Sequence, residues 1–311
     1  MGGKRMPEIA MQLTNVSKRI GKKEIIKDLS FSINRGEVFG FIGPNGAGKT
    51  TTIRMMVGLM KITEGDIHIL GKSIKSDFKQ AIREVGAIVE NPELYPFLTG
   101  AQNLKQYARM IPGVTQKDID EAVRLVGMEK ALNEKVGRYS LGMRQRIGIA
   151  QAILHKPSIL ILDEPTNGLD PAGIREIRQY IRKLAAEKNV AVIISSHLLS
   201  EIELMCDRIG IIKNGELVAT QDVRENTSST TQTLLQVEME ATPLDKALEI
   251  INEKTTAAQT NNKITFEIEK EHIPALISNL VEQNILIYEV SVTKSTLEDK
   301  FFDLIGENVI G

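Results

Sequence analysis

Cysteine is nearly absent from this sequence. Cys206 is the only cysteine in 311 residues. A single cysteine excludes an intrachain disulfide and a zinc site built from several cysteines. The sequence therefore indicates a chain that works in a reducing compartment.

Long hydrophobic runs are missing as well. The longest apolar stretches, such as Ile159–Leu162 and Val190–Ile194, have the length of strands. None approaches the roughly 20 apolar residues that a helix needs to cross a bilayer. The first residues lack the apolar region of a signal peptide, and Gly2 lacks the Ser or Thr at position 6 that myristoylation requires. We therefore expect a cytoplasmic chain that does not insert directly into a membrane.

Neither sign of charge is in excess. The chain has 39 Lys and Arg, 40 Asp and Glu, and a net charge of −1. A protein that binds nucleic acid mainly by electrostatics normally carries a basic excess, so no nucleic-acid partner is expected. With 42% hydrophobic and 25% charged residues, the composition is that of a globular protein with one large or two smaller domains.

The first part of the chain alternates strand-like and helix-like segments, which predicts an α/β domain. Val38–Ile42, Ile159–Leu162 and Val192–Ile194 are continuous apolar runs, as expected for strands covered on both sheet faces. A helix is predicted from about Thr50 to Met60. Residues 92–156 are predicted to be mostly helical, which suggests a helical insertion in the α/β core.

A change in composition predicts a second domain. Residues 221–232 are polar and rich in Ser and Thr, as in a linker. Strand-like alternation then involves Leu235, Val237 and Met239, Ile264, Phe266 and Ile268, and Tyr288, Val290 and Val292; helical spacing involves Ile273, Leu276, Ile277, Leu280 and Val281. We predict two domains, residues 1–222 and residues 223–311, the second being a small α+β accessory domain.

A glycine-rich segment between a strand and a helix matches a phosphate-binding loop. Its residues, with the one that follows, are Gly43, Pro44, Asn45, Gly46, Ala47, Gly48, Lys49, Thr50 and Thr51. Glycines let backbone N–H groups surround phosphates, and the helix N-terminus adds a favourable potential. Lys49 is placed to reach the β- and γ-phosphates, and the Thr50 hydroxyl is a Mg²⁺ ligand. A chance glycine-rich turn is the alternative, and the strand–helix context argues against it.

Two carboxylates follow a buried strand. Asp163 and Glu164 come directly after Ile159–Leu162 and before Pro165. Asp163 can hold Mg²⁺, and Glu164 can polarise an attacking water as general base. Taken alone, the pair could equally be a turn cap, but the upstream phosphate loop favours catalysis.

Ser140 and Gly142 stand just before an apolar helix. Judged locally, Ser140 is a helix N-cap, and the basic residues that follow lie on a solvated face.

Taken together, these segments resemble an ABC ATPase in order and spacing. The resemblance covers roughly residues 11–220 and predicts a P-loop NTPase core of ABC ATPase type with a helical insertion. Its five motifs are Gly43–Thr50, Ser140–Gln145, Asp163-Glu164, Gly168-Leu169-Asp170 and Ser196-His197.

The resemblance implies roles for residues outside the phosphate loop. Ser140 and Gly142 would contact the γ-phosphate of ATP bound to the opposite subunit, so that nucleotide drives homodimer formation. Asp170 would lie at that dimer interface, and His197 would be the histidine that senses the γ-phosphate. The activity implied is ATP hydrolysis with Mg²⁺, coupled to transport through a separate transmembrane permease subunit. That permease would hold the chain at the inner face of the cell membrane.

This sequence departs from the common family pattern at three places. The signature segment has Tyr-Ser-Leu-Gly-Met in place of Leu-Ser-Gly-Gly-Gln. Glu90 stands where a glutamine is usual; it can still ligate Mg²⁺, but it cannot donate a hydrogen bond. Ile20 stands where an aromatic residue usually stacks on adenine, which predicts loose discrimination between ATP and GTP.

Glu90 together with the Ser-Leu-Gly-Met-Arg-Gln-Arg signature resembles the bacitracin-resistance and lantibiotic-immunity transporter ATPases. That subgroup exports membrane-active antimicrobial peptides, which is the cargo class we expect. Drift at a tolerant position is the alternative explanation of Glu90. Another cargo, such as a drug, lipid or nutrient, is the second hypothesis. A soluble ABC ATPase acting on nucleic acid or ribosomes is a remote third one.

Residues 91–99 offer Leu94, Tyr95 and Phe97 as apolar anchors. In this family a helix of the permease docks in this region, and helix-in-groove recognition needs such anchors. Packing within the helical insertion is an equally good explanation of these side chains.

Overall fold

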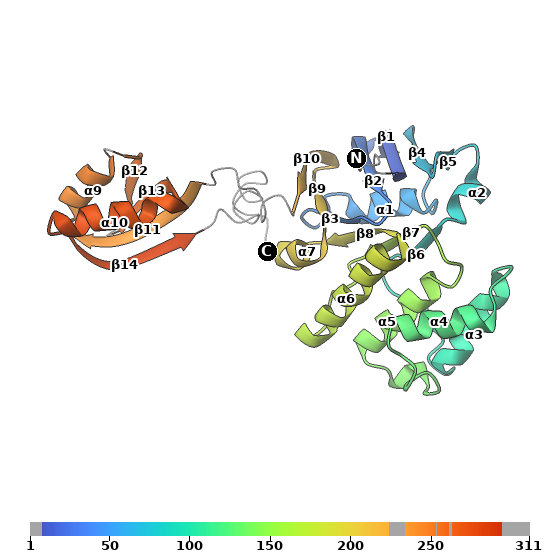
Figure 1. Ribbon diagram of the computed structural model, residues 1–311. Coiled ribbons are helices and arrows are strands. Elements are labelled where there is room, and N and C mark those ends of the chain that lie inside the picture. Colours follow the sequence, from blue (N-terminus) through green and yellow to red (C-terminus); the bar gives the residue numbers. More distant parts are fainter. Residues whose placement is uncertain (1–7, 224–233, 253, 261–262, 294–311) are drawn as a thin grey trace, which may run out of the picture. The chain divides into compact units, whose positions relative to one another are not determined.

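The structure is a computed structural model that describes residues 8–223, 234–252, 254–260 and 263–293. These residues form two compact units, which divide between Val223 and Arg224 (Figure 1). Each unit has its own hydrophobic core.

A six-stranded sheet lies at the centre of the first unit, with the order β10-β9-β3-β8-β7-β6. Its strands are β3 (Val38–Ile42), β6 (Val85–Ile88), β7 (Ile159–Asp163), β8 (Ala191–Ser196), β9 (Arg208–Lys213) and β10 (Glu216–Asp222). All neighbours are parallel except β9 and β10. β3, β7 and β8 are buried along their whole length, as the continuous apolar runs predicted. Their carboxyl ends meet at one edge, where ligands bind in open α/β sheets.

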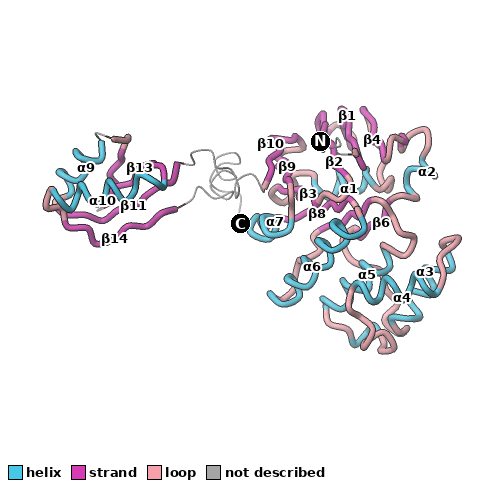
Figure 2. Tube along the Cα trace, viewed as in Figure 1, coloured by secondary structure: helices cyan, strands magenta, loops and turns pink. Residues whose placement is uncertain are grey.

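A second, antiparallel sheet packs against the first. It has the order β2-β1-β4-β5, formed by β1 (Ile9–Ile20), β2 (Lys23–Asn34), β4 (Glu64–Ile69) and β5 (Lys72–Ser73). Phe31 of β2 stacks on Phe39 and Phe41 of β3, with ring centroids 5.4 and 5.7 Å apart. The two sheets and their strands are seen in Figure 2.

The helices of this unit surround the sheets and form the insertion. They are α1 (Lys49–Met56), α2 (Phe78–Ile82), α3 (Gly100–Met110), α4 (Gln116–Leu125), α5 (Leu141–Ala152), α6 (Pro171–Lys188) and α7 (Leu199–Met205), with a 3₁₀ turn at Val136–Arg138. α3, α4 and α5 group together beside the sheet edge that carries β6 (Figure 1). None of the helices in the described ranges has both the length and the apolar character that a bilayer crossing requires.

The first of these helices is shorter than its sequence predicted. α1 ends at Met56, whereas the apolar pattern continues to Met60. The reason is Gly58, which has φ +73 and donates its N–H to the carbonyl of Met55, so the chain turns away.

The second unit is a four-stranded antiparallel sheet with two helices. Its elements are β11 (Leu234–Thr242), α9 (Leu244–Asn252), β12 (Ala257–Thr260), β13 (Lys263–Glu269), a 3₁₀ turn (Lys270–His272), α10 (Ile273–Glu282) and β14 (Leu286–Thr293). The strand order is β12-β13-β11-β14, and the core lies between the sheet and both helices. The alternation of Tyr288, Val290 and Val292 predicted one half-buried face, and this is wrong for two of the three. Only Val290 packs on the core, because β14 is an edge strand with a bulge beside Tyr288.

Candidate active site

The loop at residues 43–48 connects β3 to α1 and can be formed only by glycine at two positions. Gly48 has φ +111, and a Cβ atom there would lie 2.4 Å from Cδ1 of Ile26. A Cβ on Gly43 would lie 2.3 Å from the carbonyl oxygen of Ile212. Any side chain at either position would therefore displace the neighbouring chain.

The N-terminus of α1 is open to an anion. Gly48 is the N-cap and supplies no side-chain hydrogen bond, and the first turn carries no acidic residue. The free N–H groups and the helix dipole therefore favour negative charge at this point. Around it lie the other predicted phosphate-loop residues, namely Pro44, Asn45, Gly46, Ala47, Thr50 and Thr51, of which only Asn45 and Gly46 are largely exposed.

The ammonium group of Lys49 faces the loop. Lys49 is 7% exposed, and its Nζ donates to the carbonyl of Gly43 at 2.6 Å and to that of Pro44 at 3.4 Å. The same Nζ lies 3.7 Å from Oε1 of Glu164. Burial lowers the pKa of Lys49, and the carboxylates of Glu164 and Asp163 oppose that shift. The ammonium group of Lys49 therefore lies between the loop carbonyls and the carboxylates that follow β7.

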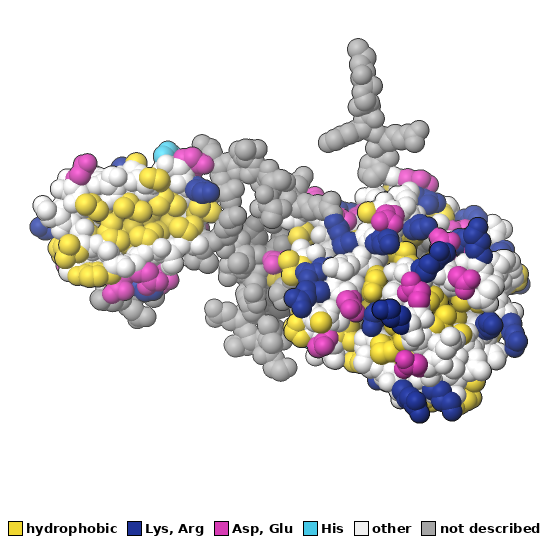
Figure 3. Space-filling model, turned by 60° about the horizontal axis from the view of Figure 1, so that its bottom comes forward, with side chains coloured by type: hydrophobic (Ala, Val, Ile, Leu, Met, Phe, Trp, Pro, Cys, Tyr) yellow, Lys and Arg dark blue, Asp and Glu magenta, His cyan; other side chains and the backbone are white. Residues whose placement is uncertain are grey.

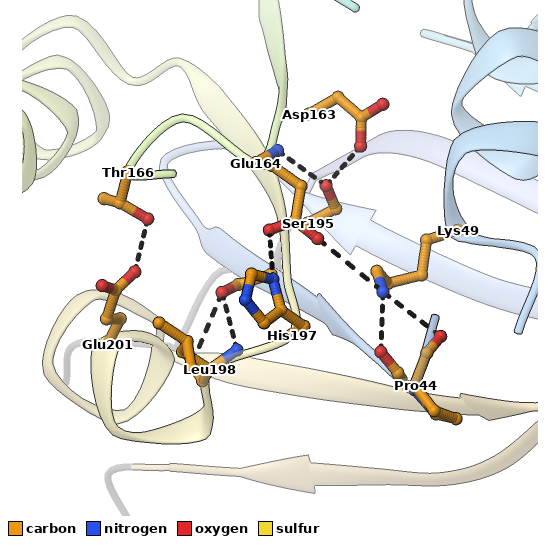
Figure 4. A network of polar contacts seen from close by, with 11 residues as sticks. Pro44, Lys49, Asp163, Glu164, Thr166, Ser195, His197, Leu198 and Glu201 are labelled. Carbon is orange, nitrogen blue, oxygen red and sulfur yellow. Dashed lines mark hydrogen bonds and ion pairs between the residues drawn. The ribbon is translucent and has the colours of Figure 1, made fainter. Parts of the chain in front are cut away.

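The two predicted carboxylates end strand β7. Asp163 is the last residue of β7 and is 3% exposed, whereas Glu164 lies beyond the strand with φ +50. A left-handed conformation is unusual for glutamate and marks a backbone held by its surroundings. The turn aims Glu164 across the ends of the parallel strands (Figure 4).

His197 adds a third side chain to the cluster of Lys49 and Glu164. Its Nδ1 lies 2.7 Å from Oε2 of Glu164, just after the end of β8. Glu164 therefore lies between His197 and Lys49, the arrangement drawn in Figure 4. Sequence reasoning selected all three residues, and the fold brings their side chains together.

Ser195 was missed by the sequence analysis. Its hydroxyl donates to Oδ1 of Asp163 at 2.6 Å and accepts from the backbone N–H of Glu164 at 2.9 Å. Ser195 is 0% exposed and lies opposite Asp163 in the parallel register of β7 and β8. A hydroxyl within the apolar strand Ala191–Ser196 was the available signal, because a buried hydroxyl needs a hydrogen-bond partner.

Ser140 and Asp170 are both helix N-caps. The Ser140 hydroxyl accepts from the N–H of Met143 at 3.2 Å, and Asp170 Oδ1 accepts from the N–H of Gly173 at 2.8 Å. A Cβ on Gly142 would lie 3.7 Å from Leu169, so the two segments are neighbours.

The polar contacts of these two segments do not include the phosphate loop of the same chain in the part of the chain that the structure describes. Among the described residues, no hydrogen bond or ion pair joins Ser140 or Gly142 to Lys49.

The remaining predicted contact residues are largely exposed. Ile20 is 52% exposed at the end of β1. Glu90 has φ +68, its side chain is 59% exposed, and it forms an ion pair with Arg54 of α1. Tyr95 and Phe97 are 50% and 67% exposed, with ring centroids 5.8 Å apart.

The oxygen donors of this site suit Mg²⁺, which keeps water in its coordination shell. They suit less well a metal whose ligands all come from the protein. The described residues contain no group of three or more His, Cys, Asp or Glu side chains that could hold a metal. Mg²⁺ normally takes one or two protein oxygens and fills its shell with water and phosphate oxygens. The buried carboxylate of Asp163 and the hydroxyl of Thr50 fit that pattern.

Comparison with known proteins identifies the family. Residues 26–167 match the family model described as ABC transporter. The uncharacterized ABC transporter ATP-binding protein YhcH of Bacillus subtilis is 55% identical, over 96% of this chain and 96% of that protein. The bacitracin transport ATP-binding protein BcrA of Bacillus licheniformis is 38% identical over 97% and 99%. The lantibiotic transport ATP-binding protein SrtF of Streptococcus pyogenes is 38% identical over 68% and 90%.

Solved structures agree with the fold. The dimeric post-hydrolysis state of the ATP-binding cassette MJ0796, bound to ADP and Pi, superposes with a TM-score of 0.62 at 26% identity and covers 69% of this chain and 99% of that one. The predicted fold class, a P-loop core of ABC ATPase type, is confirmed. The chain belongs to the ATP-binding proteins of ABC transporters, which are ATPases coupled to transport.

Proposed function

We propose that this chain hydrolyses ATP to power the export of an antimicrobial peptide, of the bacitracin or lantibiotic kind, through a separate membrane permease. The observation that carries the cargo class is the alignment with the bacitracin transport ATP-binding protein over 97% of this chain, accessory unit included. Glu90 and the altered signature support the same subgroup. The chain would work in the cytoplasm, on the inner face of the membrane, where the permease holds it.

Nucleotide binding rests on the phosphate loop. Backbone N–H groups from residues 43–48 and the N-terminus of α1 would receive the phosphates. Lys49 would turn from the loop carbonyls to the β- and γ-phosphates, which are stronger acceptors. Ile20 would pack on the base without stacking, because it has no ring.

Mg²⁺ would be held by Thr50, Asp163 and Glu90 together with phosphate oxygens. When bound, the metal neutralises charge on the phosphates being cleaved. Ser195 fixes one oxygen of Asp163 and leaves the other carboxylate oxygen free for this task.

Glu164 would be the general base. A carboxylate at this position can accept the proton of the attacking water, and its neighbour His197 would hold it in place and sense the γ-phosphate. The ion pair with Lys49 supports this role, because the carboxylate lies 3.7 Å from the ammonium group that would bind the γ-phosphate.

A second copy of the chain would complete the site. Ser140 is exposed at the N-terminus of α5, and Gly142 lies in the first turn of the same helix. They would bind the γ-phosphate held by the opposite subunit, where a helix N-terminus favours the anion. Asp170, beside them, would lie in the dimer interface.

The permease would dock beside the helical insertion. A surface hollow is lined there by Val57, Leu59, Ile82, Val85, Ala87, Ile88, Val89, Asn91, Pro92, Glu93, Gly148 and Gln151. Leu59 is 71% exposed, and Tyr95 and Phe97 lie in the adjoining segment. An apolar hollow with exposed anchors suits a short amphipathic helix.

The test is resistance in a sensitive bacterium that expresses this chain together with a candidate permease. We expect the minimal inhibitory concentration of bacitracin or of a lantibiotic to rise with the native chain and not with Glu164→Gln. Matched cultures treated with small-molecule drugs serve as the control for cargo class. Resistance to the drugs alone would contradict peptide export and favour the second cargo hypothesis.

A further inference from the structure

A buried threonine joins the loop after β7 to helix α7. Thr166 lies in that loop and is 4% exposed. Its hydroxyl donates a hydrogen bond to Oε2 of Glu201, which lies in the first turn of α7 (Figure 4). A buried hydroxyl needs a hydrogen-bond partner, and a carboxylate is a stronger acceptor than a neutral group. The contact therefore connects two segments that each follow a strand of the active site.

Glu201 differs from the carboxylates on the surface of this unit. Exposed acidic side chains are scattered among basic ones on the face of the first unit that Figure 3 shows, as on an ordinary solvated surface. Glu201 is partly buried, and the hydroxyl that it binds is almost inaccessible to solvent. The contact with Thr166 therefore explains a carboxylate at this position better than solubility does.

The loop that carries Thr166 is held by its own backbone. The N–H of Asn167 donates to the carbonyl of Glu164 at 3.1 Å, and the N–H of Leu169 donates to the carbonyl of Thr166 at 3.1 Å. These two overlapping turns begin at Glu164 and lead to Asp170, the N-cap of α6. A displacement of Thr166 therefore moves Glu164 as well, because both belong to one hydrogen-bonded turn.

The same two segments meet at a second point. His197, which precedes α7, has its Nδ1 2.7 Å from Oε2 of Glu164. Thr166 follows Glu164 by two residues, and Glu201 follows His197 by four. One contact leaves two segments free to turn about it, whereas two contacts fix their orientation. The left-handed turn at Glu164, with φ +50, needs such support from its surroundings.

The two contacts respond differently to nucleotide. His197 would serve both Glu164 and the γ-phosphate, so its hold on Glu164 would change as nucleotide binds and leaves. The hydrogen bond between Thr166 and Glu201 includes no group that would bind phosphate or Mg²⁺, so it can persist throughout the reaction cycle.

We propose that Thr166 and Glu201 are positioning residues for ATP hydrolysis, whose hydrogen bond fixes the turn that aims Glu164 at the attacking water. The inference rests on the role proposed above for Glu164 as general base. A general base acts only within hydrogen-bond reach of the proton that it accepts, so a small shift of this turn lowers the rate. ATP binding does not depend on the contact, because neither side chain belongs to the phosphate loop.

The first experiment measures the ATPase kinetics of Thr166→Val, which removes the hydroxyl at nearly constant side-chain volume. We expect kcat to fall about tenfold or more and the KM for ATP to stay within about twofold, and Glu201→Ala should do the same. The double variant should be no slower than the slower single variant, because one contact is lost in each case. Thr166→Ser keeps the hydroxyl and Glu201→Gln keeps an acceptor oxygen, so both should recover most of the rate.

The matched control is Thr115→Val. The Thr115 hydroxyl also binds a carboxylate, with 2.6 Å to Oδ2 of Asp118, but this pair lies at the start of α4 in the helical insertion. Its loss should lower thermal stability and leave the kcat of the folded fraction unchanged. If Thr166→Val likewise changes stability alone, the contact is only structural and the proposal is overturned.

The second experiment tests whether the contact acts through Glu164. Thr166→Val is combined with Glu164→Gln, and both the residual ATPase rate and the MgATP-driven dimer are measured. We expect the rate and the dimer of Glu164→Gln alone, since a base that has been removed cannot be misplaced. A further loss of rate, or a weaker dimer, would show that the contact acts elsewhere, for example through Asp170, and would overturn this inference alone. Near-normal turnover in Glu164→Gln itself would instead contradict the general base, and the inference with it.

Discussion

The carboxylate of Glu90 forms an ion pair with the guanidinium of Arg54, which lies on the helix that begins at the phosphate loop. The pair connects α1 to the segment that precedes the exposed rings of Tyr95 and Phe97. Both side chains are largely exposed, at 40% and 59%, and exposed ion pairs contribute about 0–1 kcal/mol to stability. Because the pair contributes little to stability, we propose that it links the nucleotide site to the proposed permease.

Glu90→Gln should leave ATP hydrolysis by the isolated chain within a few-fold, below about 1 kcal/mol in the activation barrier, because an amide oxygen can replace the carboxylate oxygen as a Mg²⁺ ligand. Peptide resistance in the presence of the permease should fall, and Glu90→Ala should lower it further. Arg54→Met should resemble Glu90→Gln, and the double variant should be no worse than either, because one contact is lost in each case. ATPase rates and inhibitory concentrations are measured on the same set of variants.

Loss of basal hydrolysis in Glu90→Gln would mean that the main role of Glu90 is to bind the metal or a water, and not to couple the two sites. Unchanged activity and unchanged resistance would make Glu90 a product of drift and would remove one support for peptide export.

Glu164→Gln should keep ATP bound and lose turnover by on the order of 10²-fold or more, because an amide cannot accept a proton from water. Sedimentation of this variant should show monomers without nucleotide and dimers with MgATP. Glu187→Gln, on an exposed part of α6, is the matched control and should hydrolyse ATP normally. Near-normal turnover in Glu164→Gln would contradict its assignment as general base.

Ile20 makes the specificity of the site testable. We expect GTP to be hydrolysed at a rate within about tenfold of ATP, because loss of one stacking contact removes roughly 0.5–1.5 kcal/mol. Ile20→Tyr should lower the KM for both nucleotides by up to about tenfold, since a ring stacks on either purine. A strong preference for ATP in the native chain would mean that another side chain recognises adenine.

Cys206 should resist alkylation up to high pH. Burial raises the pKa of its thiol far above the ordinary value, chiefly by desolvation, with Asp207 adding to the shift. Only the thiolate reacts, so a raised pKa means less reaction at any given pH. Labelling by iodoacetamide at pH 8 should be about 100-fold slower than in urea. Rapid labelling in the native chain would show that the strand ends around Cys206 open readily.

The site could be predicted best where the residues of a motif lie close together in the sequence. The phosphate loop, the strand that ends in Asp163 and the histidine after β8 each lie within a few residues of a strand end. Parallel strands bring their carboxyl ends to one edge, and this places Glu164 in contact with both Lys49 and His197.

The sequence could not supply contacts that depend on strand order. Arg54 and Glu90 are 36 residues apart and meet through the turn after β6. The exposure of Tyr288 follows from β14 lying at an edge, which alternation alone does not specify. The polar residues 224–232 expected to form a linker lie outside the described residues.

Ser195 provides the last prediction, because its hydroxyl links the carboxylate of Asp163 to the backbone N–H of Glu164. Ser195→Ala would release Oδ1 of Asp163 and leave the N–H of Glu164 without its partner. An unsatisfied buried group costs roughly 1–3 kcal/mol, and here the strain falls on the left-handed turn at Glu164. We expect kcat to fall about tenfold or more, the KM for ATP to change little, and the Mg²⁺ concentration for half-maximal rate to rise.

If the role of Ser195 were purely structural, Ser195→Ala would lower thermal stability. It would leave both the Mg²⁺ dependence and the kcat of the folded fraction unchanged. Ser196→Ala is the matched control, since the Ser196 hydroxyl contacts only backbone atoms of Leu198. Ser195→Thr keeps the hydroxyl and should recover part of the rate if its extra methyl group is accommodated. Equal losses in Ser195→Ala and Ser196→Ala would mean that the strand end, and not the Ser195 hydroxyl, sets the position of Glu164.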